Sequence, residues 1–185
     1  MALVMQLICQ GETLANRNSQ FPFDAPLTET SVSRVHELKK CVGPFSKIWT
    51  APDLPARQTT CELGLEGESV PELMEPSYGS WTSIPIKQII EQEHEAFQCW
   101  LSGDAPPGGE NIAQVMARTR TWLSQRIADQ GCQCAIVSSA VIRAIVIQLL
   151  DAPASSFQLI DIHPLSMTLL RSNGKRWHLN LTPFS

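Results

Sequence analysis

The sequence lacks the features that mark two large classes of protein. It has no block of basic residues, and 14 lysines and arginines against 18 aspartates and glutamates give a net charge of −4. Binding to nucleic acid depends on concentrated positive charge, so we expect no nucleic-acid partner. No apolar run reaches the roughly 18 residues of a membrane span, and no polybasic amphipathic segment suits a bilayer surface. We therefore expect no membrane partner either.

Cysteine is not scarce, but it lacks the spacing of a disulfide framework or a metal site. The six cysteines are scattered, and the pair formed by Cys132 and Cys134 is not followed by a second pair. Residues 1–8 are apolar without the positive region and small-residue cleavage site of a secretory signal. We therefore expect a cytoplasmic protein with reduced thiols, no bound metal and no cofactor.

What the sequence does contain is an alternation of apolar strand patterns and helical patterns. We expect strands at residues 1–8, 46–50, 134–138, 157–162, 167–171 and 176–181. We expect helices at residues 29–42, 55–63, 84–101, 112–127 and 141–150, with Thr28 and Asn111 as N-caps. This order predicts an α/β protein: a three-layer α/β/α sandwich with a mixed, mainly parallel central sheet. The length of 185 residues suits a single domain over 1–185, with a helical and loop insertion around 64–115.

Six short motifs follow one another along the chain. They are residues 9–13 (CQGET), 24–28 (DAPLT), 50–59 (TAPDLPARQT), 73–81 (LMEPSYGSW), 107–110 (PGGE) and 136–143 (IVSSAVIR). Each motif alone is a weak signal, but their order and separation resemble the histidine phosphatase superfamily, which has the phosphoglycerate mutase-like fold. The resemblance covers nearly the whole chain. It implies that fold and, in active members, chemistry on phosphomonoesters.

The resemblance also implies which residues stand at the catalytic positions of the family. Gln10 stands at the position of the histidine that becomes phosphorylated, and Ser138 at that of the second histidine. Cys9 and Pro55 stand at the positions of two phosphate-binding arginines. Glu75 matches the acid/base candidate of the family and is the one catalytic position that is retained.

Four further residues are expected at the same pocket. Asn16 and Arg17 follow the first motif, and His163 ends a predicted strand near the pocket rim. Ser139 takes the place of the second histidine if the alignment shifts by one residue. We expect these side chains to line the pocket without a catalytic role, and we expect Arg17 either to approach it or to be solvated.

The residue types at these positions do not suit phosphoryl transfer. That reaction depends on neutralising the phosphoryl oxygens, and the four positions that carry cations or imidazoles in the family are uncharged here. The amide of Gln10 is no substitute for a nucleophilic imidazole. Losing a single stabilising donor typically costs about 10²–10³ in rate. The sequence therefore predicts a cleft without cations and favours an inactive or strongly impaired pseudo-phosphatase with a binding or regulatory role.

Alternative mechanisms and partners remain open at this point. If active, the chain would be a phosphatase or mutase acting on a small phosphomonoester by an altered mechanism. Cys9 is one possible nucleophile, but Ala15 stands where a cysteine phosphatase has its arginine. Ser138 and Ser139 lack the glycine-flanked elbow of serine hydrolases. The pocket suits a neutral or cationic polar molecule, the alternative is a protein partner, and an oligomer is compatible with the sequence.

Overall fold

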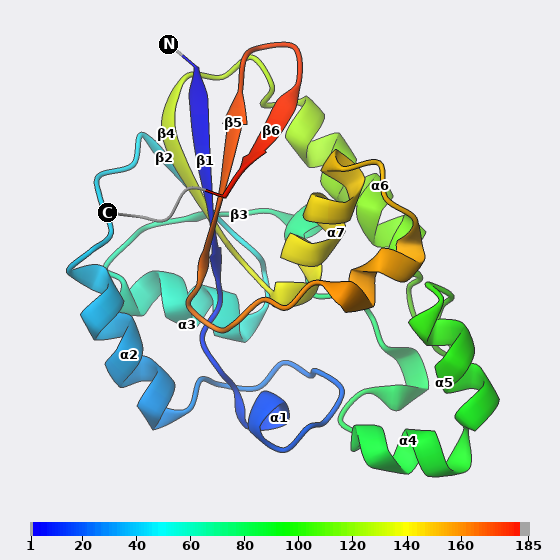
Figure 1. Cartoon of the computed structure of the whole chain (residues 1–185). Coiled ribbons are helices and arrows are strands. Elements are labelled where there is room, and N and C mark those ends of the chain that lie inside the picture. The colour runs from blue at the N-terminus through cyan, green and yellow to red at the C-terminus, as the bar shows by residue number, and fades with distance from the viewer. Residues whose placement is uncertain (1, 182–185) are drawn as a thin grey trace.

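The centre of the protein is a six-stranded sheet, seen in a computed structural model that describes residues 2–181 (Figure 1). Its strands are β1 (Leu3–Cys9), β2 (Lys47–Thr50), β3 (Glu68–Ser69), β4 (Gly131–Val137), β5 (Met167–Ser172) and β6 (Trp177–Asn180). Their order is β3-β2-β4-β1-β5-β6. The neighbours from β3 to β1 are parallel, whereas β5 runs antiparallel to both β1 and β6. The expected mixed, mainly parallel sheet is confirmed.

Helices cover both faces of this sheet. The α-helices are α1 (Leu14–Arg17), α2 (Glu29–Lys39), α3 (Leu54–Glu62), α4 (Ile86–Gln92), α5 (His94–Leu101), α6 (Ile112–Ser124) and α7 (Ser139–Leu149). Three 3₁₀ helices are η1 (Pro71–Leu73), η2 (Gly79–Trp81) and η3 (Ala154–Leu159). In Figure 1, α2 and α3 lie on one side of the sheet and α6 and α7 on the other. The three-layer sandwich is therefore confirmed.

Side-chain caps fix the starts of two helices where the sequence predicts them. The Thr28 hydroxyl accepts a hydrogen bond from the Ser31 backbone at 3.1 Å and caps α2. The Asn111 side chain accepts one from the Gln114 backbone at 2.8 Å and caps α6. Each bond satisfies a backbone donor that the first helical turn would otherwise leave unpaired.

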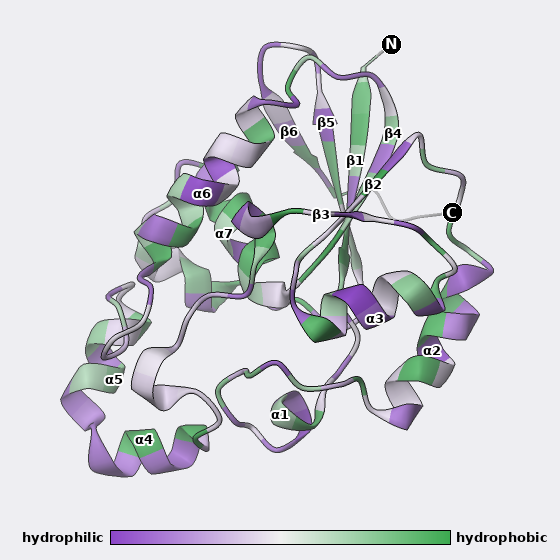
Figure 2. Cartoon of the chain, turned by 180° about the vertical axis from the view of Figure 1, so that it is seen from behind, coloured by the Kyte–Doolittle hydropathy of each residue, from purple (hydrophilic) through white to green (hydrophobic). Residues whose placement is uncertain are grey.

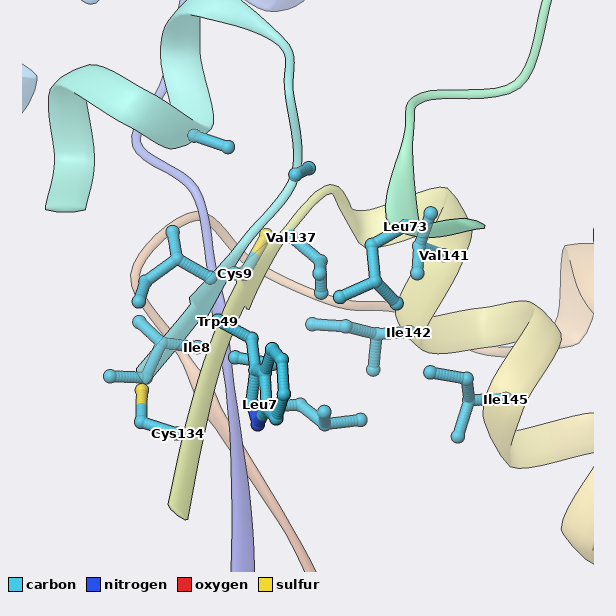
Figure 3. Packing of buried hydrophobic residues seen from close by; sticks show 14 of the residues in the cluster. Leu7, Ile8, Cys9, Trp49, Leu73, Cys134, Val137, Val141, Ile142 and Ile145 are labelled. Carbon is cyan, nitrogen blue, oxygen red and sulfur yellow. The ribbon is translucent and has the colours of Figure 1, made fainter. Parts of the chain in front are cut away.

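The main apolar core lies between β1, β4 and α7. Helix α7 is apolar along most of its length because it packs against the sheet and against α6, and it is largely green in Figure 2. Its residues Val141, Ile142 and Ile145 are fully buried. They point towards strand residues of the same cluster, which includes Leu7 and Cys9 (Figure 3). This core holds the ends of β1 and β4 in fixed positions.

The strand predicted at residues 157–162 is wrong, because residues 157–159 belong to the 3₁₀ helix η3 and residues 160–162 lie in no strand. In a strand, Phe157 and Leu159 would share a face. Instead Phe157 is 3% exposed and Leu159 is 84% exposed. The segment therefore anchors one aromatic ring in the core and leaves the rest at the surface.

The single helix predicted at residues 84–101 is two helices, α4 and α5, separated at Glu93. Glu93 leaves the helical conformation with φ −132° and ψ 44°. Its carboxylate accepts a hydrogen bond from the indole Nε1 of Trp81 at 3.0 Å. The break allows Ile89 and Phe97 to join one aromatic cluster, while Ile90 is 40% exposed. None of the helices within residues 2–181 has the length and apolar character needed to cross a membrane.

Candidate functional site

Two neighbouring parallel strands end together and deliver their next residues to one cavity. Cys9 at the end of β1 is in register with Val137 at the end of β4. The Gln10 backbone N–H donates to the Val137 carbonyl at 2.8 Å, so Gln10 and Ser138 leave the sheet side by side. The carboxyl ends of parallel strands are where α/β proteins commonly bind ligands. Here these strand ends, at the lower end of the sheet in Figure 1, border a cavity of about 760 Å³.

The structure brings nearly all of the predicted site residues to this cavity. Its lining includes Cys9, Gln10, Asn16, Pro55, Glu75, Ser138, Ser139 and His163. Arg17 is not part of the lining, because its exposed guanidinium pairs with Glu12 at 2.8 Å. The structure therefore leaves Arg17 as a solvated surface residue rather than a pocket residue.

Gln10 has an unsatisfied acceptor at this position. Its side-chain Oε1 is buried and has no hydrogen-bond partner among the described residues. Burying such an acceptor without a partner disfavours the folded state. Gln10 thus carries a buried acceptor that the described part of the chain leaves without a donor.

Glu75 is tied into the wall by polar contacts from several directions. Its backbone N–H donates to Asp53 Oδ2 at 2.8 Å, and the Tyr78 hydroxyl donates to its Oε1 at 3.2 Å. The Ser138 hydroxyl also hydrogen-bonds to its carboxylate. Burial, reinforced by the nearby charge of Asp53, raises the pKa of Glu75 to about 7 although these hydrogen bonds oppose the rise. Glu75 therefore changes charge near neutral pH.

Two more carboxyl groups continue this wall, and the sequence analysis did not assign them a role. Asp53 precedes α3, and burial raises its pKa, with a further rise from the charge of Asp24. Asp24 is exposed and accepts a hydrogen bond from the Leu54 backbone. We call Asp24, Asp53 and Glu75 the acidic side of the cavity. Aspartate is common at the N-cap of a helix, so the sequence alone does not indicate that Asp53 also lies in the cavity wall beside Glu75.

Two of the nucleophiles considered above, Cys9 and Ser138, are unavailable in this structure. Cys9 is 2% exposed, and its sulfur lies within the apolar cluster of Figure 3. Burial and the charge of Glu75 raise the pKa of the Cys9 thiol to about 12, so it stays protonated at neutral pH. Ser138 is also 2% exposed, and its Oγ accepts from the Val141 backbone at 3.3 Å to cap α7.

The expectation of a cleft without cations needs a correction. Arg143 lines the cavity, with its guanidinium 5.5 Å from the centre of the Phe157 ring. Arg143 Nη2 and His163 Nε2 each lie 3.8 Å from the Asp161 carboxylate. We call Arg143, Asp161 and His163 the paired side. Sequence spacing could not reveal this group, because Arg143 comes from α7 and the other two from the loop before β5.

Aromatic rings form another part of the wall that the sequence analysis missed. Phe21 packs against Tyr78 and Trp100 with ring centroids 5.3 Å apart in each pair. All three rings line the cavity, as do Phe23 and Phe157. Phe23 is 37% exposed, so an apolar surface continues to the cavity mouth. The site therefore combines carboxylates with aromatic faces.

The donor atoms of the described chain do not suggest a metal centre. Within residues 2–181, no three His, Cys, Asp or Glu side chains are grouped so that they could hold a metal ion. The carboxyl groups of the acidic side are therefore not arranged to coordinate a metal ion together.

Comparison with known proteins agrees with this geometry. Residues 5–183 match the model of the histidine phosphatase superfamily, branch 1. No protein of curated function matches the sequence.

Several solved structures share the fold at low sequence identity. Mycobacterial hydrolase 1 superposes with a TM-score of 0.88 at 22% identity, and the match covers 98% of both chains. The mycobacterial glucosyl-3-phosphoglycerate phosphatase in complex with VO3 gives 0.84 at 23% identity, covering 97% of this chain and 96% of that one. A putative alpha-ribazole-5'-P phosphatase from Escherichia coli gives 0.86 at 19% identity, covering 97% and 95%. At these identities the structures establish a shared fold, and the family model, which spans nearly the whole sequence, places the chain in the histidine phosphatase superfamily.

Proposed function

We propose that this chain is a catalytically inactive or strongly impaired member of the superfamily with a binding or regulatory role. In this role its cavity binds a small molecule. The main observation in support of the proposal is the chemical nature of the two residues that follow β1 and β4. Gln10 supplies an amide and Ser138 a buried hydroxyl that already caps α7. Neither group offers the free nucleophile that transfer of a phosphoryl group to the protein requires.

The charges around the cavity support the same proposal. A transferring phosphoryl group carries negative charge that active sites neutralise with cations and aimed donors. Here the single guanidinium in the described lining, that of Arg143, faces Asp161. The acidic side adds further carboxyl groups. A phosphate ester in this cavity would therefore meet more repulsion than stabilisation.

The remaining histidine of the cavity is also poorly placed for catalysis. The His163 side chain is 80% exposed and lies beside Asp161, which is 79% exposed. A nucleophilic imidazole needs a fixed orientation towards its substrate, which packing and buried hydrogen bonds usually provide. His163 belongs to the open rim instead.

The alternative is a phosphatase that acts on a small phosphomonoester by an altered mechanism. Two observations favour it: Arg143 lines the cavity, and the Glu75 pKa of about 7 suits a general acid or base. In that mechanism Glu75 would protonate the leaving group or activate water, and Arg143 would bind the phosphoryl oxygens.

A turnover assay separates the two functions. The purified chain is incubated with p-nitrophenyl phosphate and with a panel of sugar phosphates, beside Glu75→Gln and the charge-matched surface control Glu66→Gln. We expect all three proteins to give the same background rate. Turnover by the unmodified chain and by Glu66→Gln that falls about 10²–10³-fold in Glu75→Gln would establish the alternative instead.

A further inference from the structure

The acidic side of the cavity lacks a partner of opposite charge. Arg143 and His163, the arginine and the histidine of the described lining, each lie 3.8 Å from Asp161. No lysine, arginine or histidine within residues 2–181 forms an ion pair with any of the three acidic-side carboxyl groups. The cavity therefore has one balanced group and one group of uncompensated carboxyls.

The guanidinium of Arg118, which is not part of the lining, already has partners. Arg118 on α6 influences Glu75 and Asp53 at a distance. It binds both oxygens of Glu110 at 2.8 and 2.9 Å and donates to the Glu72 carbonyl at 2.7 Å. This bidentate geometry commits the guanidinium to Glu110, so Arg118 acts on the acidic side only from a distance and forms no ion pair with it.

An independent observation concerns hydrogen-bond acceptors. The buried Oε1 of Gln10 lacks a donor, and this residue lines the same cavity as the acidic side. An ammonium group carries the positive charge that the acidic side lacks, and its N–H groups would donate to Oε1 once the Gln10 amide turned into the cavity. A phosphate ester carries mainly acceptors and negative charge, and satisfies neither.

The apolar part of the wall defines the rest of the ligand. Phe21, Trp100 and Phe157 line the cavity. Met74 and Phe23 also line it, and these two residues are 46% and 37% exposed. Aromatic faces attract cations and also cover hydrocarbon. The carboxyl groups do not form a metal-binding cluster among the described residues. An organic cation therefore fits this wall better than a metal ion.

Resting on the binding function proposed above, we propose that the cavity binds an organic ammonium ion, with its charged nitrogen at the acidic side and near Gln10 and its apolar body against the aromatic wall. The chemical class is a primary or secondary amine on an aromatic or aliphatic body.

This binding is coupled to the protonation of Glu75. The titratable groups that face Glu75 are Asp53, the Tyr78 hydroxyl, the Cys9 thiol and, more distantly, Arg118. Burial raises the pKa of Tyr78 and of Cys9, so both stay neutral near pH 7. Since a cation favours the ionised carboxylate, affinity rises as the pH increases through about 7.

The test compares three compounds with one body and different charge: phenethylamine, 2-phenylethanol and 2-phenylethyl phosphate. Each is titrated into the ¹⁵N-labelled chain, and the amide signals of Gln10 and Tyr78 are followed. We expect phenethylamine to bind at least about tenfold more tightly than the alcohol, and the phosphate to produce no saturable shift. The same order is expected for cyclohexylmethylamine against its alcohol and phosphate.

Variants connect the binding to the acidic side. Asp53→Asn keeps the oxygen that accepts the Glu75 N–H, and Asp24→Asn removes a charge at an exposed position; each should weaken phenethylamine binding about threefold to tenfold. Glu66→Gln is the matched surface control and should leave binding unchanged. Glu75→Gln should abolish the pH dependence, whereas His163→Gln at the rim should retain it.

Two results would overturn the inference. One is that no amine binds at the cavity more tightly than its alcohol and phosphate partners. The other is that Asp53→Asn and Asp24→Asn both bind the amine as tightly as the unmodified chain does. Binding of the phosphate without turnover would overturn the ammonium ligand and leave the inactive binding function standing. Turnover that depends on Glu75 would overturn the proposed function itself, so the two failures are distinguishable.

Discussion

The two sides of the cavity contain similar groups but balance their charges differently. On the paired side, Asp161 faces a guanidinium and an imidazole at the solvent-exposed rim. On the acidic side, burial and neighbouring carboxylates raise the pKa of Asp53 and Glu75, and no cation within residues 2–181 forms an ion pair with either group. The difference teaches that an arginine in its lining does not by itself make a cavity an anion-binding site. What matters is whether that arginine already forms an ion pair with a carboxylate of the protein.

The largest expected effect comes from neutralising the acidic side. The pKa of Glu75 is raised from 4.5 to about 7, so the folded state holds its proton more tightly than the unfolded state does. Its stabilising contribution is therefore present below about pH 4.5 and is lost as the pH rises through about 7. Glu75→Gln removes this loss and should raise the free energy of unfolding at about pH 8 by on the order of 3 kcal/mol.

Urea unfolding at about pH 4.5 and about pH 8 measures this prediction. The gain should appear at the higher pH only, and Glu66→Gln should follow the unmodified chain at both. A Glu75→Gln protein that is no more stable than the unmodified chain at the higher pH would mean that Glu75 is solvated rather than desolvated.

A smaller effect of opposite sign is expected on the paired side. Arg143 is 23% exposed and packs near the Phe157 ring, so Arg143→Gln loses packing as well as charge. We expect a destabilisation of about 1–2 kcal/mol, and tighter binding of phenethylamine because the cavity becomes more negative. Thermal unfolding and the NMR titration measure the two parts. Weaker phenethylamine binding in Arg143→Gln would show that the two sides do not act as described.

The smallest effect is expected at the exposed acid of the paired side. The Asp161 side chain is 79% exposed, so solvent screens its contacts with Arg143 and His163. Asp161→Asn should change the free energy of unfolding by less than about 0.5 kcal/mol. Urea unfolding at neutral pH is the measurement. A loss above about 2 kcal/mol would place this ion pair among the buried, structural ones.

The fold could be predicted from the sequence where local patterns decide it. The apolar runs of β1 and β4 and the caps Thr28 and Asn111 are local signals, and the structure follows them. The segment after Pro153 was misread because a short apolar stretch fits a strand and a 3₁₀ helix equally well. The break at Glu93 depends on a hydrogen bond from Trp81, which precedes α4 and α5. The single-domain organisation and the cytoplasmic location stay predictions.

The candidate site could be predicted where a site residue lies within one of the sequence motifs. The ordered motifs brought Gln10, Glu75 and Ser138 to a common cavity. The charge environment could not be predicted in the same way, because it arises between motifs. Asp53 acts on Glu75 from a different segment, and Arg143 meets Asp161 across a loop. Ionisation depends on such contacts and on burial, which only the folded chain defines.

The most direct test of the account is a titration of the ¹⁵N-labelled chain with inorganic phosphate at neutral pH. Gln10, which follows β1, and Ser139, the first residue of α7, both line the cavity and provide the signals. We predict that both amide signals stay in place up to about millimolar phosphate. This concentration is of the order of the dissociation constant of weak specific binding. Saturable shifts of both signals at micromolar phosphate would contradict the claim that this cavity has lost its affinity for phosphate.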